Sequence, residues 1–508
     1  MMTIASPYKS SLLSEILADC PNVDDHKDQS ISGLASNSLD VKAGYLFVAL
    51  AGLQVHGIDY AINAVKSGAV AVVYDQEDEY SKRRIALLKK QVNTEWIGIG
   101  GLDMQTGIIA SRFFGNPGKS LKIVGVTGTD GKTSVTHLIC QALTQLGQQV
   151  ASIGTLGYGL VDQLEPASHT TPDAITLQSL LSRFRDQKCD TVIMEVSSHA
   201  LQQYRVNGCQ FDIAVLTNLG RDHLDYHGSM DNYAAAKSRL FFQFELSGKV
   251  VNAADQFGQK LLEQLTDDGL VRYSSRSDGS NNADVVLTKF RATDRGQSLE
   301  IKTPEGVLNL ETELIGDFNR ENTLACISSL FALGMNLTEI QLATEQLKPI
   351  PGRMELIIPQ TDSIARVVVD FAHTEQALRA CLTASRDYCK GSLWCIFGCG
   401  GDRDQGKRSK MGQTAEALAD RLIITDDNPR TESPGKIVSE ILQGLVHPDR
   451  ASIVHDRRAA IDFALAEAGP DDLIVIAGKG HELEQIIGNE RLPFNDRHIV
   501  KQIYGRFL

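Results

Sequence analysis

Residues 128–134, Gly-Thr-Asp-Gly-Lys-Thr-Ser, combine glycines, a lysine and hydroxyl groups in a pattern that suits phosphate binding. Glycines let backbone N–H groups approach a phosphate, and the N-terminus of a following helix favours anions. Lys132 can neutralise the β- and γ-phosphates of a nucleotide, and the Thr133 hydroxyl can bind Mg²⁺. The spacing differs from the standard P-loop, which would place a glycine at Val126. We still expect ATP to bind here, through Gly128, Thr129, Asp130, Gly131, Lys132, Thr133 and Ser134.

The segments on either side of this loop predict that it connects a strand to a helix. A strand-like apolar run covers residues 121–127, and apolar residues recur at helical spacing between 135 and 146. Further strand-like runs lie at 191–195 and 212–217. This alternation predicts a central α/β domain over residues 116–350, of the P-loop ATPase type, with a mostly parallel sheet.

Two more domains are expected on either side. Strand-like runs at 45–50, 69–74 and 96–99 predict an N-terminal α/β domain over residues 1–115, and the turn-rich segment 114–119 reads as a linker. The remaining residues, 351–508, predict a C-terminal Rossmann-like α/β domain. A chain of 508 residues agrees with this division, at ~100–200 residues per domain.

Four polar clusters follow strands of the C-terminal region. Ligands of open α/β sheets bind outside the carboxyl ends of the strands. We therefore expect these clusters to form a substrate site. The strands are 367–370, 393–397, 422–425 and 473–476, and the clusters are AHTE, GCGGDRD, DDNPR and AGKGHE.

Composition narrows the class of protein. Hydrophobic residues make up 42% and charged residues 22%, and the formal net charge is −13, with no basic block that would indicate nucleic-acid binding. We see no signal peptide and no apolar run near the ~18 residues that span a bilayer. The nine cysteines are scattered, which is typical of reduced thiols. We expect a cytoplasmic protein without a membrane span.

The ordered motifs resemble those of the Mur ligase family. They are TGTDGKTS at 127–134, HTTPD at 169–173, EVSSHAL at 195–201, NLGRDHLDYHGSMDNYAAAK at 218–237, GDFNRENTL at 316–324, PGRME at 351–355, DFAHTEQAL at 370–378, GCGGDRDQGKR at 398–408, DDNPR at 426–430 and AGKGHE at 477–482. The last two narrow the resemblance to members that add meso-diaminopimelate. It implies an amide ligase of cell-wall precursor synthesis that joins meso-diaminopimelate to UDP-N-acetylmuramoyl-L-alanyl-D-glutamate through an acyl phosphate.

The same resemblance implies ATP, Mg²⁺ at two sites and CO₂ as cofactors. The implied catalytic residues are Lys132, Glu195, His223 and Lys237, and the implied metal ligands are Thr133, Glu195, His223 and Lys237 carbamylated by CO₂. From the residues alone, Glu195 could equally be a solvated glutamate, His223 a loop-capping histidine and Lys237 a surface lysine. His199 and His227 lie nearby in sequence and are not included.

Further residues match the substrate contacts of the family. For adenosine and phosphates they are Asn319, Asn322, Arg353 and Asp370, although GDFNREN could instead cap a helix. For the muramoyl dipeptide they are Thr170, Thr171, Ser197, Gln203 and Arg205, whereas the contact at His169 is open because the family often has asparagine there. For uridine diphosphate, bound by the N-terminal domain, they are Leu34, Ser36, Ser38, Leu53, Gln54 and Val55, with the register between 36 and 38 open.

The proposed amino-acid site has a chemical logic of its own. The far end of diaminopimelate carries an amine and a carboxylate, whereas lysine carries only an amine. Arg430 can bind the carboxylate in a bidentate manner, and Glu482 can bind the ammonium. The alternative for DDNPR is a turn with a surface arginine. The matching residues are Arg403, Asp427, Asn428, Pro429, Arg430, Gly478 and Glu482.

Two kinds of alternative stay open. Within the same chemistry, the chain could be a lysine-adding Mur ligase or resemble folylpolyglutamate synthase. A lysine-adding enzyme has no distal carboxylate for Arg430 to bind. In a different class, it could be a P-loop kinase or a nucleotide-dependent binding module that forms no amide.

Overall fold

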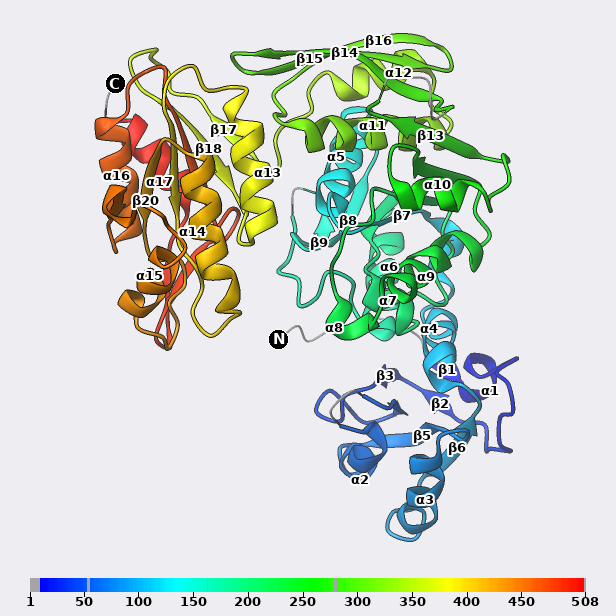
Figure 1. The fold of residues 1–508 in the computed structure, drawn as a ribbon. Helices are drawn as coiled ribbons and strands as arrows, with labels where there is room; N and C mark the ends of the chain where they lie inside the picture. The colour runs from blue at the N-terminus through cyan, green and yellow to red at the C-terminus, as the bar shows by residue number, and fades with distance from the viewer. Residues whose placement is uncertain (1–9, 53–54, 162, 277–281, 507–508) are drawn as a thin grey trace. The chain divides into compact units, whose positions relative to one another are not determined.

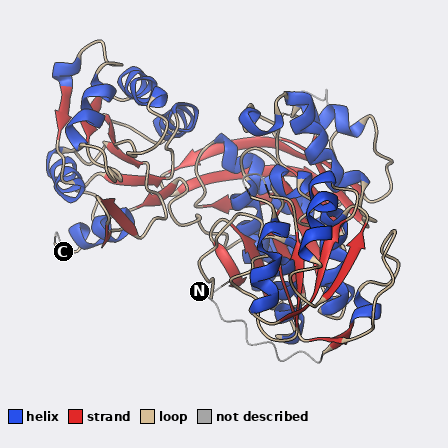
Figure 2. Cartoon of the chain, turned by 90° about the horizontal axis from the view of Figure 1, so that it is seen from below, coloured by secondary structure: helices blue, strands red, loops and turns tan. Residues whose placement is uncertain are grey.

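The computed structural model describes residues 10–52, 55–161, 163–276 and 282–506 (Figure 1). Strands and helices alternate along the chain, and Figure 2 shows the strands gathered between helices. Contacts divide the chain into two compact units, Met1–Arg272 with Ser328–Gly334, and Tyr273–Ile327 with Met335–Leu508. The α/β class expected from the sequence is confirmed.

The N-terminal region contains a four-stranded parallel sheet in the order β3-β4-β5-β6. Alternate side chains of a strand point to opposite faces, and the two faces of this sheet carry separate apolar cores. Leu46 and Val48 of β4 belong to one core, and Phe47 and Ala49 to the other. The elements are β1 (Ser11–Leu12), α1 (Leu13–Ile16), β2 (Ser30–Ile31), β3 (Gly33–Ala35), β4 (Tyr45–Ala49), α2 (Ala61–Lys66), β5 (Ala69–Asp75), α3 (Glu79–Leu88), β6 (Glu95–Ile99) and α4 (Leu102–Phe113).

A ten-stranded sheet in the order β16-β15-β14-β13-β12-β11-β7-β10-β8-β9 forms the central region. β7 (Lys122–Thr127) pairs in parallel with β10 (Thr191–Glu195) and β11 (Ile213–Leu216), so the carboxyl ends of these strands share one edge. The three strands confirm the runs seen in the sequence. Other strands are β8 (Val150–Gly154), β9 (Gly157–Leu160), β12 (Gly248–Asn252), β13 (Leu270–Ser274), β14 (Val285–Thr293), β15 (Gly296–Thr303) and β16 (Gly306–Thr312).

Helices of the central region begin directly after several of these strands. α5 follows the glycine-rich loop, and its Val135, Leu138 and Ile139 are fully buried, as their helical spacing predicts. The helices are α5 (Lys132–Gln145), α6 (Ala174–Asp186), α7 (Ser198–Gln202), α8 (Leu224–His227), α9 (Met230–Phe242), α10 (Gln256–Leu262), α11 (Asp317–Ala332) and α12 (Leu337–Thr344).

The C-terminal region contains a six-stranded sheet in the order β17-β18-β22-β19-β20-β21. All neighbours are parallel except β17, so the four strands expected from the sequence end at one edge. Separate apolar cores again cover the two faces. The elements are β17 (Glu355–Ile357), β18 (Arg366–Asp370), α13 (Glu375–Arg386), β19 (Leu393–Phe397), α14 (Gly406–Leu418), β20 (Arg421–Ile424), α15 (Pro434–Leu442), β21 (Ala451–Ile453), α16 (Arg457–Glu467), β22 (Leu473–Ala477), β23 (Glu484–Ile487), β24 (Glu490–Pro493) and α17 (Asp496–Tyr504).

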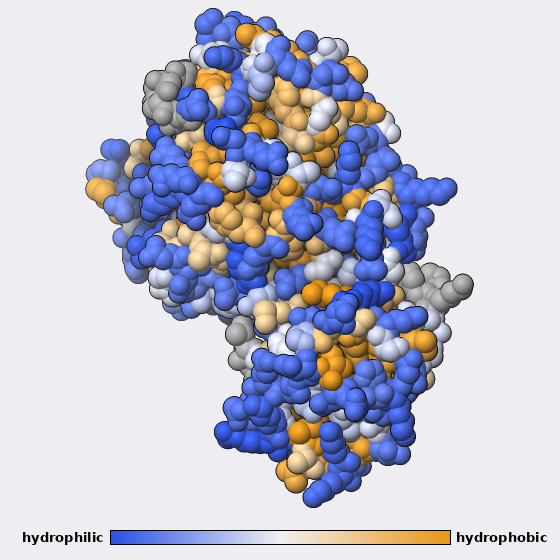
Figure 3. Space-filling view, turned by 90° about the vertical axis from the view of Figure 1, so that its right-hand side faces the viewer, coloured by the Kyte–Doolittle hydropathy of each residue, from blue (hydrophilic) through white to orange (hydrophobic). Residues whose placement is uncertain are grey.

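Hydrophilic residues predominate on the face drawn in Figure 3, with apolar residues interspersed among them. Among the residues that the structure describes, no helix is long and apolar enough to cross a membrane.

Candidate active site

The glycine-rich loop lies between the end of β7 and the start of α5, at the centre of the ten-stranded sheet. Gly128 has φ +151°, and a Cβ atom built there would lie 1.8 Å from Thr217 Oγ1, so only glycine fits. The neighbouring strand end holds the loop. Thr129 N donates to Asn218 O at 2.9 Å, and Asp130 N donates to Asn218 Oδ1 at 3.0 Å. A loop fixed in this way presents backbone N–H groups at a helix N-terminus, as phosphate binding requires.

Two lysine side chains reach the same carbonyl oxygen of this loop. Lys132 Nζ donates to Gly128 O at 2.9 Å and to Thr129 O at 2.7 Å, and Lys237 Nζ donates to Gly128 O at 2.6 Å. Lys237, on α9, is only 1% exposed, so it is not a surface lysine. Burial, together with the charge of Lys132, lowers the pKa of Lys237 well below its usual value. The neutral form of the Lys237 amine is therefore more accessible than that of a solvated lysine.

Glu195, the last residue of β10, is 1% exposed and is not a solvated glutamate. Its Oε2 accepts a hydrogen bond from Thr133 Oγ1 at 2.9 Å, which brings together two of the expected metal ligands. Its Oε1 accepts from Thr155 N at 2.7 Å, and Thr155 Oγ1 lies 3.3 Å from Oε2. Hydroxyl and carboxylate oxygens are ligands that Mg²⁺ prefers, so this donor set fits the ion.

His223 lies in the polar turn before α8, with φ +52° and a side chain that makes no capping bond to that helix. Its Nε2 lies 3.3 Å from Asp222 Oδ2, and its ring packs 4.8 Å from that of His199 and 6.1 Å from that of Tyr233, measured between centroids. The structure therefore groups His223 with other rings. In the described ranges no three His, Cys, Asp or Glu side chains cluster in an arrangement that would hold a metal ion by themselves.

The residues expected to bind the muramoyl dipeptide continue from Glu195 as one hydrogen-bonded set. Thr171 Oγ1 donates to Glu195 O at 2.8 Å and accepts from Ser197 N at 3.1 Å. Thr170 Oγ1 lies 3.1 Å from Thr155 Oγ1. The hydroxyl of Ser197 also caps α7, by accepting from Ala200 N at 3.1 Å.

An arginine extends this set. Arg205 Nη1 donates to Thr171 O at 3.0 Å, and its Nε and Nη2 donate to Gln203 Oε1 at 2.9 and 2.6 Å. Gln203 Nε2 in turn donates to Tyr226 OH at 2.9 Å. The structure thus brings together all five residues that the sequence assigned to this substrate.

Three of the residues expected at the uridine end, Leu34, Ser36 and Ser38, lie in β3 or directly after it. Leu34 belongs to this strand and is buried, as is Ser38, whereas Val55 is exposed. Ser36 directly follows the strand. Leu53 and Gln54 lie outside the described residues.

The residues expected around adenosine form two pairs. On α11, Asn319 Nδ2 donates to Ile315 O at 2.9 Å, and Asn322 Nδ2 donates to Asn319 Oδ1 at 3.1 Å. Both asparagines are buried. Asp370 accepts from the backbone N–H of Met354 at 2.7 Å and of Ala372 at 2.8 Å.

Burial dominates the titration of the second pair. It raises the pKa of Asp370, and the backbone hydrogen bonds and the charge of Arg353 oppose this shift. The Arg353 guanidinium lies over the ring of Phe371, 4.7 Å from its centroid. Arg353 and Asp370 therefore lie in one electrostatic environment.

The amino-acid residues lie in the loops that follow β19, β20 and β22. Arg430 has φ +51°, and its backbone is held on both sides, because its N–H donates to Ile486 O at 3.1 Å and its carbonyl accepts from Gly488 N at 2.8 Å. Its Nη1 donates to Gly401 O at 2.7 Å. Arg430 is thus fixed in place rather than being a freely solvated arginine.

A second group in these loops centres on a buried lysine. Lys479 Nζ donates to Asn428 Oδ1 at 3.0 Å and to Glu482 Oε2 at 2.8 Å, and Asn428 Nδ2 donates to Glu482 Oε2 at 2.9 Å. Burial raises the pKa of Glu482, but the bonds from Lys479 and Asn428 outweigh it and lower the pKa overall. The carboxylate is therefore held in its ionised form.

Close backbone approach connects these loops. A Cβ atom at Gly478 would lie 2.5 Å from Asp427 Oδ2, and one at Gly401 would lie 1.9 Å from Pro429 O. A Cβ atom at Gly400 would meet Arg430 Nη1 at 2.9 Å and Arg403 Cγ at 3.7 Å. All seven residues assigned to the amino acid therefore lie in one set of adjoining loops.

Two contacts at these sites were not expected from the sequence. Thr155 lies between β8 and β9 in no recognisable motif, and only the three-dimensional pairing with Glu195 reveals it. Lys479 stands inside AGKGHE, between two glycines directly after a buried strand, and this position is the sequence signal that marks it.

Comparisons with known proteins cover nearly the whole chain. The model of the Mur ligase family catalytic domain matches residues 30–113, that of the Mur ligase middle domain residues 126–330, and that of the Mur ligase glutamate ligase domain residues 352–480. These segments follow the order of the three expected domains. The boundaries expected at 115/116 and 350/351 stay predictions.

Relatives and solved structures agree with these matches. Proteins named UDP-N-acetylmuramoyl-L-alanyl-D-glutamate–2,6-diaminopimelate ligase are 42% identical in Alkalilimnicola ehrlichii, over 97% of this chain and 98% of the relative, and 42% identical in Coxiella burnetii, over 95% and 97%. A solved structure of a ligase with that name has a TM-score of 0.72 and 33% identity, covering 98% of this chain and 99% of its own. Folylpolyglutamate synthase of Mycobacterium tuberculosis shares the fold, with a TM-score of 0.59, 18% identity, and coverage of 79% of this chain and 96% of its own.

Proposed function

The chain belongs to the Mur ligase family, with its three-domain architecture, and on this premise we propose that it joins meso-diaminopimelate to UDP-N-acetylmuramoyl-L-alanyl-D-glutamate, using ATP. The observation that carries the choice of amino acid is the pair of fixed charges in the loops after β19, β20 and β22. Arg430 is held there beside Gly401, and Glu482 is held beside Lys479 and Asn428. These groups suit a ligand end that carries both a carboxylate and an ammonium.

The reaction begins at the glycine-rich loop. An oxygen of the D-glutamyl carboxylate attacks the γ-phosphorus of ATP, and the bond to the β-phosphate oxygen breaks, which forms an acyl phosphate and ADP that stays bound until the amide has formed. Backbone N–H groups at the start of α5 and the Lys132 ammonium bind the phosphates during this step, while Asn218 accepts from the N–H groups of Thr129 and Asp130 and holds the loop. Mg²⁺, when bound by Thr133 and Glu195, would offset the charge of the approaching anions.

Amide formation completes the reaction. The neutral amine of diaminopimelate attacks the acyl carbon, phosphate leaves, and the nitrogen gives up a proton. Arg430 binds the distal carboxylate, and we assign the distal ammonium to Glu482 Oε1, because Lys479 and Asn428 both contact Oε2. The muramoyl dipeptide is oriented by Thr170, Thr171, Ser197, Gln203 and Arg205. Adenosine and phosphates are bound by Asn319, Asn322, Arg353 and Asp370. The uridine end is bound by Leu34, Ser36, Ser38, Leu53, Gln54 and Val55.

A carbamate at Lys237 is part of the proposal. The neutral amine attacks the carbon of CO₂, an N–C bond forms, and the nitrogen releases a proton, which leaves an anion. The burial of Lys237 and the nearby charge of Lys132 favour the neutral amine that this step needs. The anion would relieve the repulsion between two lysines at Gly128 O and, with His223, would hold the second Mg²⁺.

Replacing Arg430 with alanine should lower kcat/KM for meso-diaminopimelate by about 10²-fold or more, because a charge-assisted, bidentate contact is lost. The apparent affinities for ATP and the muramoyl dipeptide should stay nearly unchanged. The ratio of kcat/KM for meso-diaminopimelate to that for L-lysine should fall, mainly because kcat/KM for meso-diaminopimelate decreases. The measurement is kcat/KM for both amino acids in the wild type and the variant.

Arg491→Ala is the matched control, since this arginine also lies in the C-terminal region but its side chain is 70% exposed. It should leave the kinetics with both amino acids unchanged. A wild-type enzyme that uses L-lysine as well as meso-diaminopimelate would refute the amino-acid assignment and leave the ligase chemistry standing.

The alternative classes predict different products. A kinase would release ADP without an amino acid, and a binding module would release none. We propose that ADP release requires both the muramoyl dipeptide and the amino acid, and that the enzyme works in the cytoplasm, where its UDP-linked substrate would be made.

A further inference from the structure

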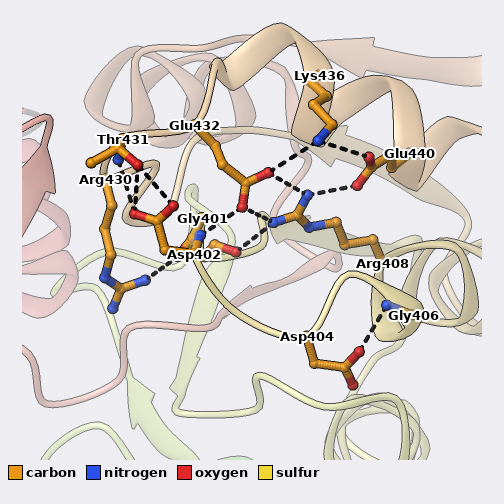
Figure 4. A network of polar contacts seen from close by, with 11 residues as sticks. Gly401, Asp402, Asp404, Gly406, Arg408, Arg430, Thr431, Glu432, Lys436 and Glu440 are labelled. Atoms are coloured by element: carbon orange, nitrogen blue, oxygen red, sulfur yellow. Dashed lines mark hydrogen bonds and ion pairs between the residues drawn. The ribbon is translucent and has the colours of Figure 1, made fainter.

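A buried arginine outside the proposed substrate contacts links the loop that carries Arg430 to the loop after β19 (Figure 4). Arg408, on α14, has a fully buried side chain. Its Nη1 donates to Glu440 Oε2 at 2.6 Å and to Glu432 Oε2 at 3.0 Å, and its Nη2 donates to Glu432 Oε1 at 2.8 Å and to Gly400 O at 3.0 Å. One guanidinium thus binds the loop after β19, the loop after β20 and helix α15.

Glu432 carries this connection toward the substrate loops. Its Oε1 accepts from Asp402 N at 2.6 Å, and the Asp402 carboxylate accepts from Thr431 N at 3.1 Å and from Thr431 Oγ1 at 2.8 Å. The hydrogen bonds from Arg408 lower the pKa of Glu432 to about 2. The Glu432 carboxylate therefore stays charged, and the two loops stay connected, at any pH at which the protein would work.

The connected segments are the ones that hold the Arg430 side chain. Arg430 Nη1 donates to the carbonyl of Gly401. The residues on either side of Gly401 are held in place, because Gly400 O accepts from Arg408 and Asp402 N donates to Glu432. Arg430 also adopts a left-handed backbone, φ +51°, which a non-glycine residue adopts only where its surroundings impose it. A shift of the 400–402 loop would therefore move the guanidinium.

We propose that Arg408 is a positioning residue for the selection of meso-diaminopimelate: through Glu432 and the 400–402 loop, it sets the place of the Arg430 guanidinium without touching substrate itself. The inference rests on the proposed function. Lysine cannot replace Arg408, because a single ammonium cannot make the four contacts of the planar guanidinium at once.

The test compares Arg408→Lys, Glu432→Gln and a control, Lys436→Gln, in the purified full-length enzyme. Lys436 lies 3.8 Å from both glutamates, but its side chain is 54% exposed, so its loss should change little. Arg408→Lys should raise KM for meso-diaminopimelate about 10-fold, with kcat within about threefold and KM for ATP unchanged. Glu432→Gln should also raise KM for meso-diaminopimelate. This second variant keeps the proposal testable if Arg408→Lys does not fold.

A double-mutant cycle separates positioning from a general loss of structure. If Arg408 acts through Arg430, then Arg408→Lys should add nothing to the effect of Arg430→Ala on the use of meso-diaminopimelate. The proposal would be overturned if the fold-changes of the two single variants multiplied in the double variant. It would also be overturned if KM for ATP rose as much as KM for meso-diaminopimelate, or if KM for meso-diaminopimelate stayed unchanged in both Arg408→Lys and Glu432→Gln. A wild-type enzyme that does not prefer meso-diaminopimelate would instead overturn the proposed function, and this is seen before any variant is made.

Discussion

Replacing Lys132 with alanine should lower kcat by about 10³-fold or more, because the transferred phosphoryl group loses the fixed positive charge beside it. In the structure this side chain is held at the loop itself, by hydrogen bonds to the carbonyls of Gly128 and Thr129. It therefore already lies where the phosphates of ATP would bind. The measurement is ADP release at saturating substrates, with circular dichroism to verify that the variant folds.

Lys122→Ala is the control, because this lysine lies on the same strand–loop–helix unit but is exposed at the start of β7. Its activity should match that of the wild type. A tenfold loss of rate corresponds to a rise of about 1.4 kcal/mol in the activation barrier. A folded Lys132→Ala enzyme that loses less than this would contradict the assignment of this loop.

Lys237→Ala should be nearly inactive, with a loss of about 10²–10³-fold in kcat, and acetate should partly restore it. The expected cause is the loss of a carbamate anion, which a small carboxylate can replace in the space left by the side chain. In wild-type enzyme supplied with ¹³C-bicarbonate, NMR should show a carbamate resonance that the variant lacks. Burial and the charge of Lys132 lower the pKa of the Lys237 amine, which raises the share of the neutral form that reacts with CO₂.

Acetate added to Lys132→Ala is the control for this rescue, since that variant lacks a cation rather than an anion. It should not recover. A wild-type spectrum without a carbamate resonance, together with no effect of acetate on Lys237→Ala, would show that Lys237 acts as an amine or not at all.

Much of the fold could be predicted from the sequence because its strands are short and apolar and end at polar clusters. The strands expected at 191–195 and 393–397 have those same limits in the structure, because every residue in them is buried and all but Thr191 and Glu195 are apolar. The antiparallel strands β14, β15 and β16 were not expected. Exposed residues such as Phe290 and Val307 interrupt the alternation that would have identified them.

The candidate site was only partly predictable, for a different reason. Local motifs identify residues such as Lys132 and Arg430, because each motif keeps its residues within one loop. The partners of those residues come from distant segments: Thr155 lies 40 positions from Glu195, and Glu432 lies 24 from Arg408. No local pattern shows such pairs. The burial of Glu195 and Lys237 excludes the interpretation that they are solvated, and burial too is a property of the folded chain rather than of a motif.

A competition between two amino acids tests directly whether the enzyme selects meso-diaminopimelate. Wild-type enzyme is supplied with ATP, Mg²⁺, UDP-N-acetylmuramoyl-L-alanyl-D-glutamate and equal concentrations of meso-diaminopimelate and L-lysine, and the amide products are counted by mass spectrometry. A site built around Arg430 rejects a ligand that lacks its carboxylate by up to about 10⁴-fold. We expect the diaminopimelate product almost alone, formed in step with ADP. Comparable amounts of both amides, or ADP released without either amide, would contradict it.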